Sequence, residues 1–296
     1  MSTGLPENFP FKSNYADIYE SSIHYIDENE FQESETVFLF LHGNPTSSFL
    51  WRNIIPHLKS LGRCVAPDLI GFGKSGKPDI DYTFDDHYRY MEAFIEELNL
   101  QNIILVVHDW GGAIGFHYAR KHPEKITGMV FMETFYKPME WENLDPFARW
   151  LFRRFIDPKW GERLNGKLNL FLSFILPFSM YQKLSASEKK TYTAPFQAPQ
   201  SRKPIVMFPQ ELPFQGSGTK NEEIANVYFN WLQRSNIPKL LLYAKPGVQI
   251  TGKQVDELQS NLINITVKYV GKGKHFIQED QPDTIGKEIV RWYRGL

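Results

Sequence analysis

Asp109 carries the clearest chemical signal in this sequence of 296 residues. It follows the apolar run at 103–107, which predicts a fully buried strand, and it precedes Gly111-Gly112, which predict a helix that starts close against that strand. A sharp strand-to-helix turn lifts its side chain into a cleft. With a reference pKa of about 3.9, an Asp is ionised at neutral pH and needs no base before it attacks. The residue type suits substitution at a saturated carbon carrying a leaving group, which gives an alkyl ester that water must then cleave.

Two neutral hydrogen-bond donors accompany this carboxylate. Asn44 lies in a Gly-Asn-Pro turn after an expected strand, and Trp110 directly follows Asp109. Their backbone N–H groups would receive the charge that develops on the ester carbonyl oxygen during hydrolysis. Their side chains, an amide and an indole, could hold a departing halide, because two neutral donors suit a large and weakly hydrated anion. The alternatives are an ordinary turn for Asn44 and simple packing for Trp110.

A general base and an acid to orient it are also present. Among eight histidines, His275 is the one that follows the last expected strand, so the order nucleophile, acid, histidine is possible. Glu133 directly follows the expected strand at 128–132, whereas 244–249, after the next strand, contain no acid and Asp256 falls in an expected helix. Glu133 is therefore expected to hold the imidazole tautomer and to stabilise the imidazolium. His42 and His108 are expected to support the loops.

Strand-like runs alternate with helical segments along most of the chain. The expected strands are 22–26, 36–41, 63–66, 103–107, 128–132, 240–243 and 266–270. This alternation predicts a mostly parallel, doubly wound sheet. It stops between 135 and 216, where Phe, Trp and Pro are frequent and where Phe147, Leu151, Phe152 and Phe155 follow helical spacing. We predict a helical cap at 135–216, inserted into an α/β core formed by 1–134 and 217–296.

Composition limits the partners of the protein. The 33 basic and 34 acidic residues nearly cancel and form no long like-charge block, so neither nucleic acid nor a membrane surface is an expected partner. The single cysteine, Cys64, excludes an intramolecular disulfide and falls in an expected core strand. Residues 1–15 lack the apolar region of a signal peptide, and the apolar window 168–181 is too short to span a bilayer. A soluble, cytoplasmic protein is expected, and its oligomeric state is not legible from the sequence.

These residues together resemble the haloalkane dehalogenases of the α/β-hydrolase superfamily. The resemblance is to the subfamily whose acid is a Glu after strand six, a group that also contains the Renilla-type coelenterazine luciferases. It covers essentially the whole chain and rests on 42–48, 51–52, 66–71 with 73–75, 108–111, 132–133, 208–209 with 211–213, 246–248, and 275 with 278–280. It implies an eight-stranded, mostly parallel sheet with an inserted helical cap.

The resemblance also implies roles for individual residues. Asp109 would be the nucleophile, His275 the base, Glu133 the acid, and Asn44 with Trp110 the halide-binding pair. The substrate pocket would be lined by Phe152, Phe171, Phe208, Pro209 and Val248. The implied substrate is a small halogenated aliphatic compound, converted to an alcohol and a halide ion without metal or organic cofactor. The chain departs from the family pattern at Gln249, where relatives often have an aliphatic residue, and at Leu144, where some carry a cap Trp.

Three other functions stay open. Epoxide hydrolases share the elbow and a cap, but they usually have an aromatic residue in place of Asn44 and need cap tyrosines, for which Tyr181 and Tyr192 could be proposed. A coelenterazine luciferase would use the same five residues, and light emission on addition of coelenterazine would identify it. A non-catalytic binding protein is a third class, against which the intact set of reactive residues argues.

Overall fold

The computed structural model describes residues 9–28, 34–143 and 146–296. Within them, eight strands form one sheet in the order β1-β2-β4-β3-β5-β6-β7-β8. The strands are β1 (Asn14–Ile18), β2 (Ser21–Glu28), β3 (Val37–Leu41), β4 (Arg63–Pro67), β5 (Ile103–Asp109), β6 (Ile126–Thr134), β7 (Lys239–Pro246) and β8 (Ile265–Gly273). Pairing is antiparallel for β1 with β2 and for β2 with β4, and parallel from β4 to β8. The mostly parallel sheet is confirmed, and β1 is the strand that the apolar runs did not predict.

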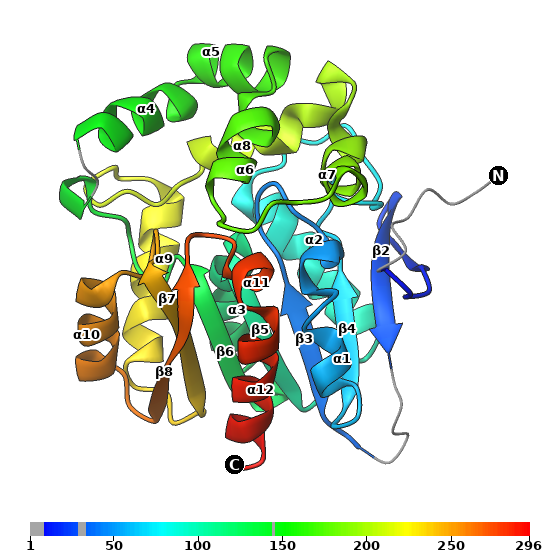
Figure 1. The fold of residues 1–296 in the computed structure, drawn as a ribbon, viewed down its shortest axis with the longest axis vertical. Helices are drawn as coiled ribbons and strands as arrows, with labels where there is room; N and C mark the ends of the chain where they lie inside the picture. The colour runs from blue at the N-terminus through cyan, green and yellow to red at the C-terminus, as the bar shows by residue number, and fades with distance from the viewer. Residues whose placement is uncertain (1–8, 29–33, 144–145) are drawn as a thin grey trace.

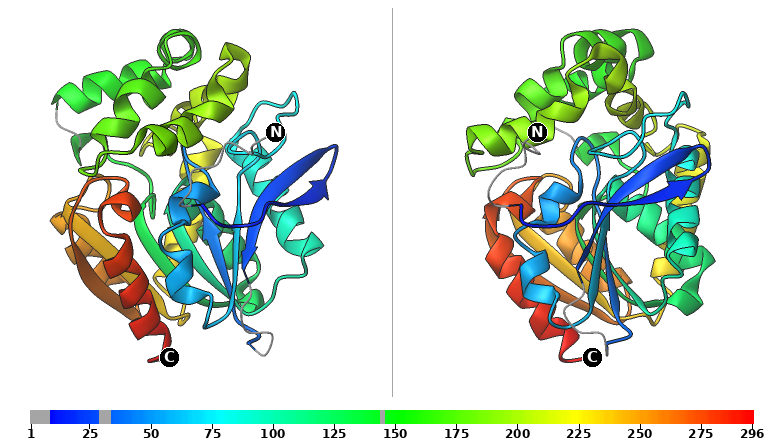
Figure 2. Two further views of the ribbon diagram at one scale, coloured as in Figure 1. Left: turned by 45° about the vertical axis from the view of Figure 1, so that its right-hand side comes forward. Right: turned by 90° about the vertical axis from the view of Figure 1, so that its right-hand side faces the viewer.

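Helices cover both faces of the sheet (Figure 2). Those of the described residues are α1 (Ile55–Leu58), α2 (Phe84–Glu97), α3 (Trp110–Lys121), α4 (Pro146–Ile156), α5 (Pro158–Gly161), α6 (Leu176–Phe178), α7 (Ala186–Thr193), α8 (Lys203–Gln210), α9 (Lys220–Leu232), α10 (Gly252–Asn261), α11 (Ile277–Asp280) and α12 (Pro282–Tyr293), with short 3₁₀ and π turns between some of them. Helices α1 and α12 pack against each other on one face, and α3 packs against α2 and α9 on the other. No helix in the described ranges is both long and apolar enough to cross a bilayer.

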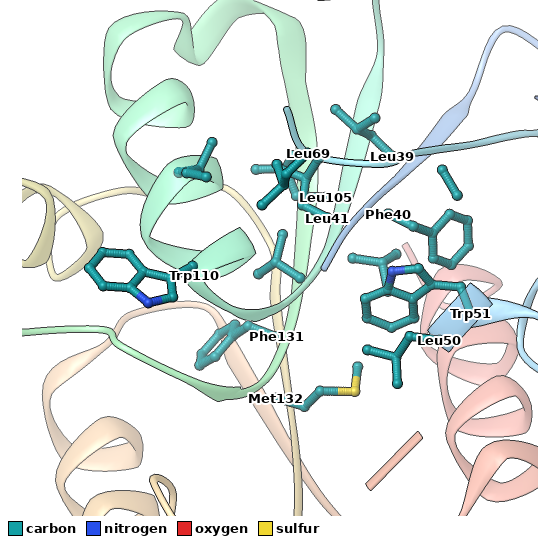
Figure 3. Close-up of a cluster of buried hydrophobic side chains, with 14 of the residues drawn as sticks. Leu39, Phe40, Leu41, Leu50, Trp51, Leu69, Leu105, Trp110, Phe131 and Met132 are labelled. Carbon is teal, nitrogen blue, oxygen red and sulfur yellow. The ribbon is translucent and has the colours of Figure 1, made fainter. Parts of the chain in front are cut away.

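The core lies on the central strands, which are buried on both faces. Every residue of β3 and β5 is buried, as expected for parallel strands covered by helices on both sides. Figure 3 shows part of this interior, and its labelled side chains are Leu39, Phe40, Leu41, Leu50, Trp51, Leu69, Leu105, Trp110, Phe131 and Met132. The rings of Phe40 and Trp51 lie 5.5 Å apart. Cys64 in β4 is fully buried, as predicted.

Helices α4 to α8 follow β6 and gather over one end of the sheet, at the top of Figure 1. Buried Arg52 joins this layer to the core, because it pairs with Glu188 of α7 at 2.8 Å and with Glu279 of α11 at 2.7 Å. The residues at helical spacing lie in α4 as predicted, and Phe147 among them is 70% exposed and stacks on Trp150. It lies in the first turn of α4, whereas Phe155 near the other end of this helix is buried.

Candidate active site

Asp109 lies on the turn that the sequence predicts. It is the last residue of β5, it is 5% exposed, and its φ of 51° falls in the left-handed region that side chains rarely adopt. The following helix can start this close only because of two glycines. A Cβ on Gly111 would lie 2.1 Å from the carbonyl oxygen of Leu41, and one on Gly112 would lie 1.7 Å from Oγ1 of Thr134. The strained turn therefore depends on glycine at both positions.

One oxygen of Asp109 is held by the loop after β3. The backbone N–H of Asn44 donates to Oδ1 at 2.8 Å, and a Cβ on Gly43 would lie 2.1 Å from the same atom. His42 fixes this loop: its Nε2 accepts from the N–H of Leu69 at 2.9 Å, so its Nδ1 carries the proton toward the Gly43 carbonyl. Burial lowers the pKa of His42, which keeps it in this neutral form. Oδ1 is thus fixed, and Oδ2 is the oxygen left for chemistry.

His275 lies between two carboxylates. Its Nε2 is 3.5 Å from Oδ2 of Asp109, and its Nδ1 is 3.4 Å from Oε2 of Glu133. Burial alone lowers the pKa of His275, but its hydrogen bonds to both carboxylates outweigh burial and raise the pKa to about 9. Burial has the opposite effect on Asp109 and raises its pKa, but the hydrogen bond and the charge of His275 outweigh burial. The pKa of Asp109 is therefore lowered. At neutral pH the pair is therefore a carboxylate and an imidazolium.

Glu133 is fully buried and held by the loop after β7. It accepts from the backbone N–H groups of Val248, Gln249 and Ile250, at 3.0, 2.9 and 3.3 Å. Such a run of N–H groups forms an anion-binding concavity. The register of β6 against β5 shifts here, which makes Glu133 a bulged residue with φ of 43° and re-aims its side chain. The loop after β7, which contains no acidic residue, thus supplies the backbone N–H donors that hold the Glu133 carboxylate on β6.

His108 supports the backbone at His275. Its Nε2 donates to the carbonyl oxygen of His275 at 2.9 Å, and the two rings lie 4.5 Å apart. Burial lowers the pKa of His108 to about 3, so it stays neutral and keeps this donating tautomer. Its role is structural, as predicted for His108, and it holds the C-terminal loop against β5.

Asn44 and Trp110 line a common cavity with Asp109 and His275. The Trp110 indole is 3% exposed and stacks on Phe208 at 4.8 Å, and Phe208 in turn stacks on His87 at 4.2 Å. The sequence-based placement of Phe208 on the pocket wall is therefore corrected. Phe208 is fully buried behind Trp110 and is not among the cavity-lining residues, because stacking on the indole and on His87 occupies its ring.

The cavity has a volume of about 440 Å³ and mostly apolar walls. Of the predicted pocket residues, it is lined by Phe152, Phe171, Pro209 and Val248, together with Leu151, Phe155, Ile175 and Leu212. Gln249 also lines it and donates from Nε2 to Oδ2 of Asp109 at 3.2 Å. In the sequence Gln249 is a departure from the family pattern, and its residue type alone indicates no role. Leu144, the other departure, lies outside the described residues.

Comparisons with known proteins identify the family of the chain. Residues 36–282 match the α/β-hydrolase fold family. A haloalkane dehalogenase from Mesorhizobium japonicum is 42% identical over 284 residues, 95% of this chain and 91% of the relative, and one from Bradyrhizobium diazoefficiens is 40% identical over 88% and 87%. The crystal structure of a haloalkane dehalogenase from Bradyrhizobium elkani has a TM-score of 0.92 and 37% identity, covering 96% of this chain and 98% of that one. The chain belongs to the haloalkane dehalogenase family of the α/β-hydrolase fold.

Proposed function

We propose that this protein hydrolyses haloalkanes to an alcohol, a halide ion and a proton, through a covalent ester on Asp109. The observation that supports this most directly is the unequal environment of the two Asp109 oxygens. Oδ1 is held by the Asn44 backbone N–H, whereas Oδ2 contacts His275 and Gln249, two side chains that line the cavity. The first oxygen becomes the ester carbonyl and the second is the attacking atom.

In the first step, Oδ2 forms a bond to the substrate carbon and the halide leaves with the electrons of the broken bond. The Asn44 amide and the Trp110 indole, both on the cavity wall, receive the halide. The aromatic and aliphatic walls exclude water, which strengthens these two neutral hydrogen bonds. Neutral donors also allow the halide to be released afterwards, since they hold an anion less strongly than a charged group does.

Ester formation changes the charge around His275. The ester is neutral, so one of the two carboxylates that raise the pKa of His275 is removed. Glu133 alone is then left to oppose burial, so the pKa of His275 falls and the imidazolium loses its proton to solvent. The reaction proton is therefore released after the halide step and before hydrolysis, and His275 becomes a neutral base at the moment a base is needed.

In the second step, His275 takes a proton from a water molecule that attacks Cγ of Asp109. Negative charge develops on Oδ1, where the backbone N–H of Asn44 lies at 2.8 Å and the backbone N–H of Trp110 also contacts the carboxylate. Glu133 stabilises the imidazolium through Nδ1. Loss of the alcohol restores the ionised Asp109 beside a protonated His275, which is the starting state.

The rival functions receive less support. An epoxide hydrolase needs a proton donor above the nucleophile, but neither Tyr181 nor Tyr192 lines the cavity, and the Tyr192 hydroxyl donates to Glu279. A luciferase would share the reactive residues, so coelenterazine is included in the test below, and light emission would favour that function. We also propose that 135–216 form a cap unit. The proposed location is the cytoplasm, and cell fractionation would test that location.

The test follows bromide and pH together while the protein is mixed with bromoalkanes of several chain lengths. We expect bromide and protons in equal amounts. No bromide above background from any bromoalkane would contradict the proposed function.

A further inference from the structure

The side-chain amide of Gln249 has two ends in different surroundings. Its Nε2 donates to Oδ2 of Asp109 at 3.2 Å, whereas its Oε1 is buried and has no hydrogen-bond partner among the described residues. An ionised carboxylate only accepts hydrogen bonds, so the amide nitrogen must face Asp109 and the oxygen must face away. A buried, unpaired carbonyl is unfavourable, and here the charge on Asp109 is what holds the amide in this orientation.

The backbone of Gln249 has a separate role. Its N–H donates to Oε2 of Glu133 at 2.9 Å, in the same loop that supplies two further N–H groups to that carboxylate. This contact does not depend on the side chain. A substitution at Gln249 can therefore remove the amide near Asp109 while it leaves the hydrogen bonds to Glu133 in place.

Ester formation removes the reason for the resting orientation. Once Oδ2 is bonded to the substrate carbon it carries no charge and is a poor acceptor, so the hydrogen bond from Gln249 is lost. We propose that the amide then turns over and that its Oε1 accepts a hydrogen bond from the hydrolytic water, whose other hydrogen points to Nε2 of His275. This inference rests on the proposed function and deepens it: Gln249 contacts the reacting atoms and acts in the hydrolysis of the ester.

The geometry allows one water to reach both groups. The amide nitrogen of Gln249 and Nε2 of His275 lie 3.2 and 3.5 Å from the same oxygen of Asp109. Rotation about the last side-chain torsion of Gln exchanges nitrogen and oxygen without moving the backbone, and this torsion is broad and nearly two-fold. In the step, the water oxygen bonds to Cγ and the bond from Cγ to the alkyl oxygen breaks. One water proton ends on His275 and the other on the alcohol.

The test separates the two half-reactions in single-turnover mixing with 1-bromohexane. Bromide release reports the first, and decay of the ester, followed by mass and by hexanol formation, reports the second. Gln249→Met keeps the length of the side chain without the amide, and Gln259→Met makes the same change on the exposed side of α10 as a control. We expect Gln249→Met to slow ester decay roughly tenfold, the worth of about one hydrogen bond, with bromide release no slower than in the wild type.

Gln249→Glu gives a second readout. It keeps an oxygen that can accept from water, so ester decay should be faster than in Gln249→Met. The added carboxylate raises the pKa of His275, so the pH profile of ester decay should move to higher pH. The displaced profile tests that residue 249 lies close to His275, and faster decay than in Gln249→Met tests the accepting oxygen, which a purely structural role for Gln249 would not require.

Two results would overturn the inference: ester decay in Gln249→Met within twofold of the wild type, or equal slowing of bromide release and ester decay. An unmoved pH profile in Gln249→Glu would also count against it. If the wild type itself releases no bromide, the proposed function fails and the inference falls with it. Bromide release by the wild type without selective slowing in Gln249→Met would overturn the inference alone.

Discussion

Replacing Asp109 by Asn removes one of the two carboxylates beside His275 and leaves a neutral side chain there, as ester formation does. The rise in the pKa of His275 from 6.5 to about 9 corresponds to about 3 kcal/mol in favour of the charged ring, at about 1.4 kcal/mol per pKa unit. This rise is net of burial, which lowers the pKa of His275, so the two carboxylates together supply more than this amount; they lie at nearly equal distances, 3.5 and 3.4 Å, and each therefore supplies more than half of it. We expect Asp109→Asn to lower the pKa of His275 by more than one unit, to below about 8.

The assay is a pH titration of the His275 ring signals by NMR in the wild type and in Asp109→Asn. Asp256→Asn makes the same chemical change on an exposed part of α10 and serves as the control, in which the pKa of His275 should stay near 9. A wild-type pKa near 6.5, or a change of less than half a unit in Asp109→Asn, would refute the reasoning. In that case ester formation could not convert His275 into a base.

The same values link pH to stability. The pKa of His275 is higher in the folded protein, about 9, than its ordinary value of 6.5, which applies when the chain is unfolded. The ion pair therefore contributes stability that is complete below about pH 6.5 and is lost as the pH rises through about 9. Urea unfolding should show this decline in the wild type and a smaller one in Asp109→Asn.

Three further substitutions test the supports of the site. Gly43→Ala places a Cβ 2.1 Å from Oδ1 of Asp109, so bromide release should fall at least ~100-fold with an unchanged circular dichroism spectrum; near-normal release would contradict the close approach. Trp110→Phe keeps an aromatic ring but removes the indole N–H, and kcat should fall roughly 100-fold, whereas an unchanged kcat would exclude the indole as a halide donor. Asp68 accepts from the N–H of Ser48 and pairs with buried His24, so Asp68→Ala should lower the free energy of unfolding by about 3–5 kcal/mol in urea; a loss below about 1 kcal/mol would contradict this.

Much of the site was predictable because the decisive signals are local. An apolar run that ends in Asp109 and two glycines specifies a buried strand, a sharp turn and a close helix, and the structure has all three. No acidic residue directly follows β7 in the sequence, which left Glu133 as the expected partner of His275. In the structure Glu133 lies on β6, the preceding strand, and contacts His275. The hydrogen bonds from the β7 loop to Glu133 were not predictable, because backbone N–H groups leave no mark on residue type.

The features that sequence reasoning missed depend on long-range packing. β1 is short, and Tyr15 within it is 55% exposed, so this edge strand has no continuous apolar run. Phe208 could equally line the pocket or lie behind Trp110, and only its stacking on the indole decides between them. Gln249 was visible as an unusual residue, but its contact with Asp109 joins positions 140 residues apart.

The covalent ester on Asp109 is the central claim, and the most direct measurement is the mass of that residue in a protein that cannot hydrolyse the ester. We would mix His275→Phe with a bromoalkane, count the bromide released, and digest the protein for mass spectrometry. We expect one equivalent of bromide and a peptide containing Asp109 that is heavier by the alkyl group. Continued turnover by His275→Phe, or a bromide burst without an alkyl group on Asp109, would contradict it.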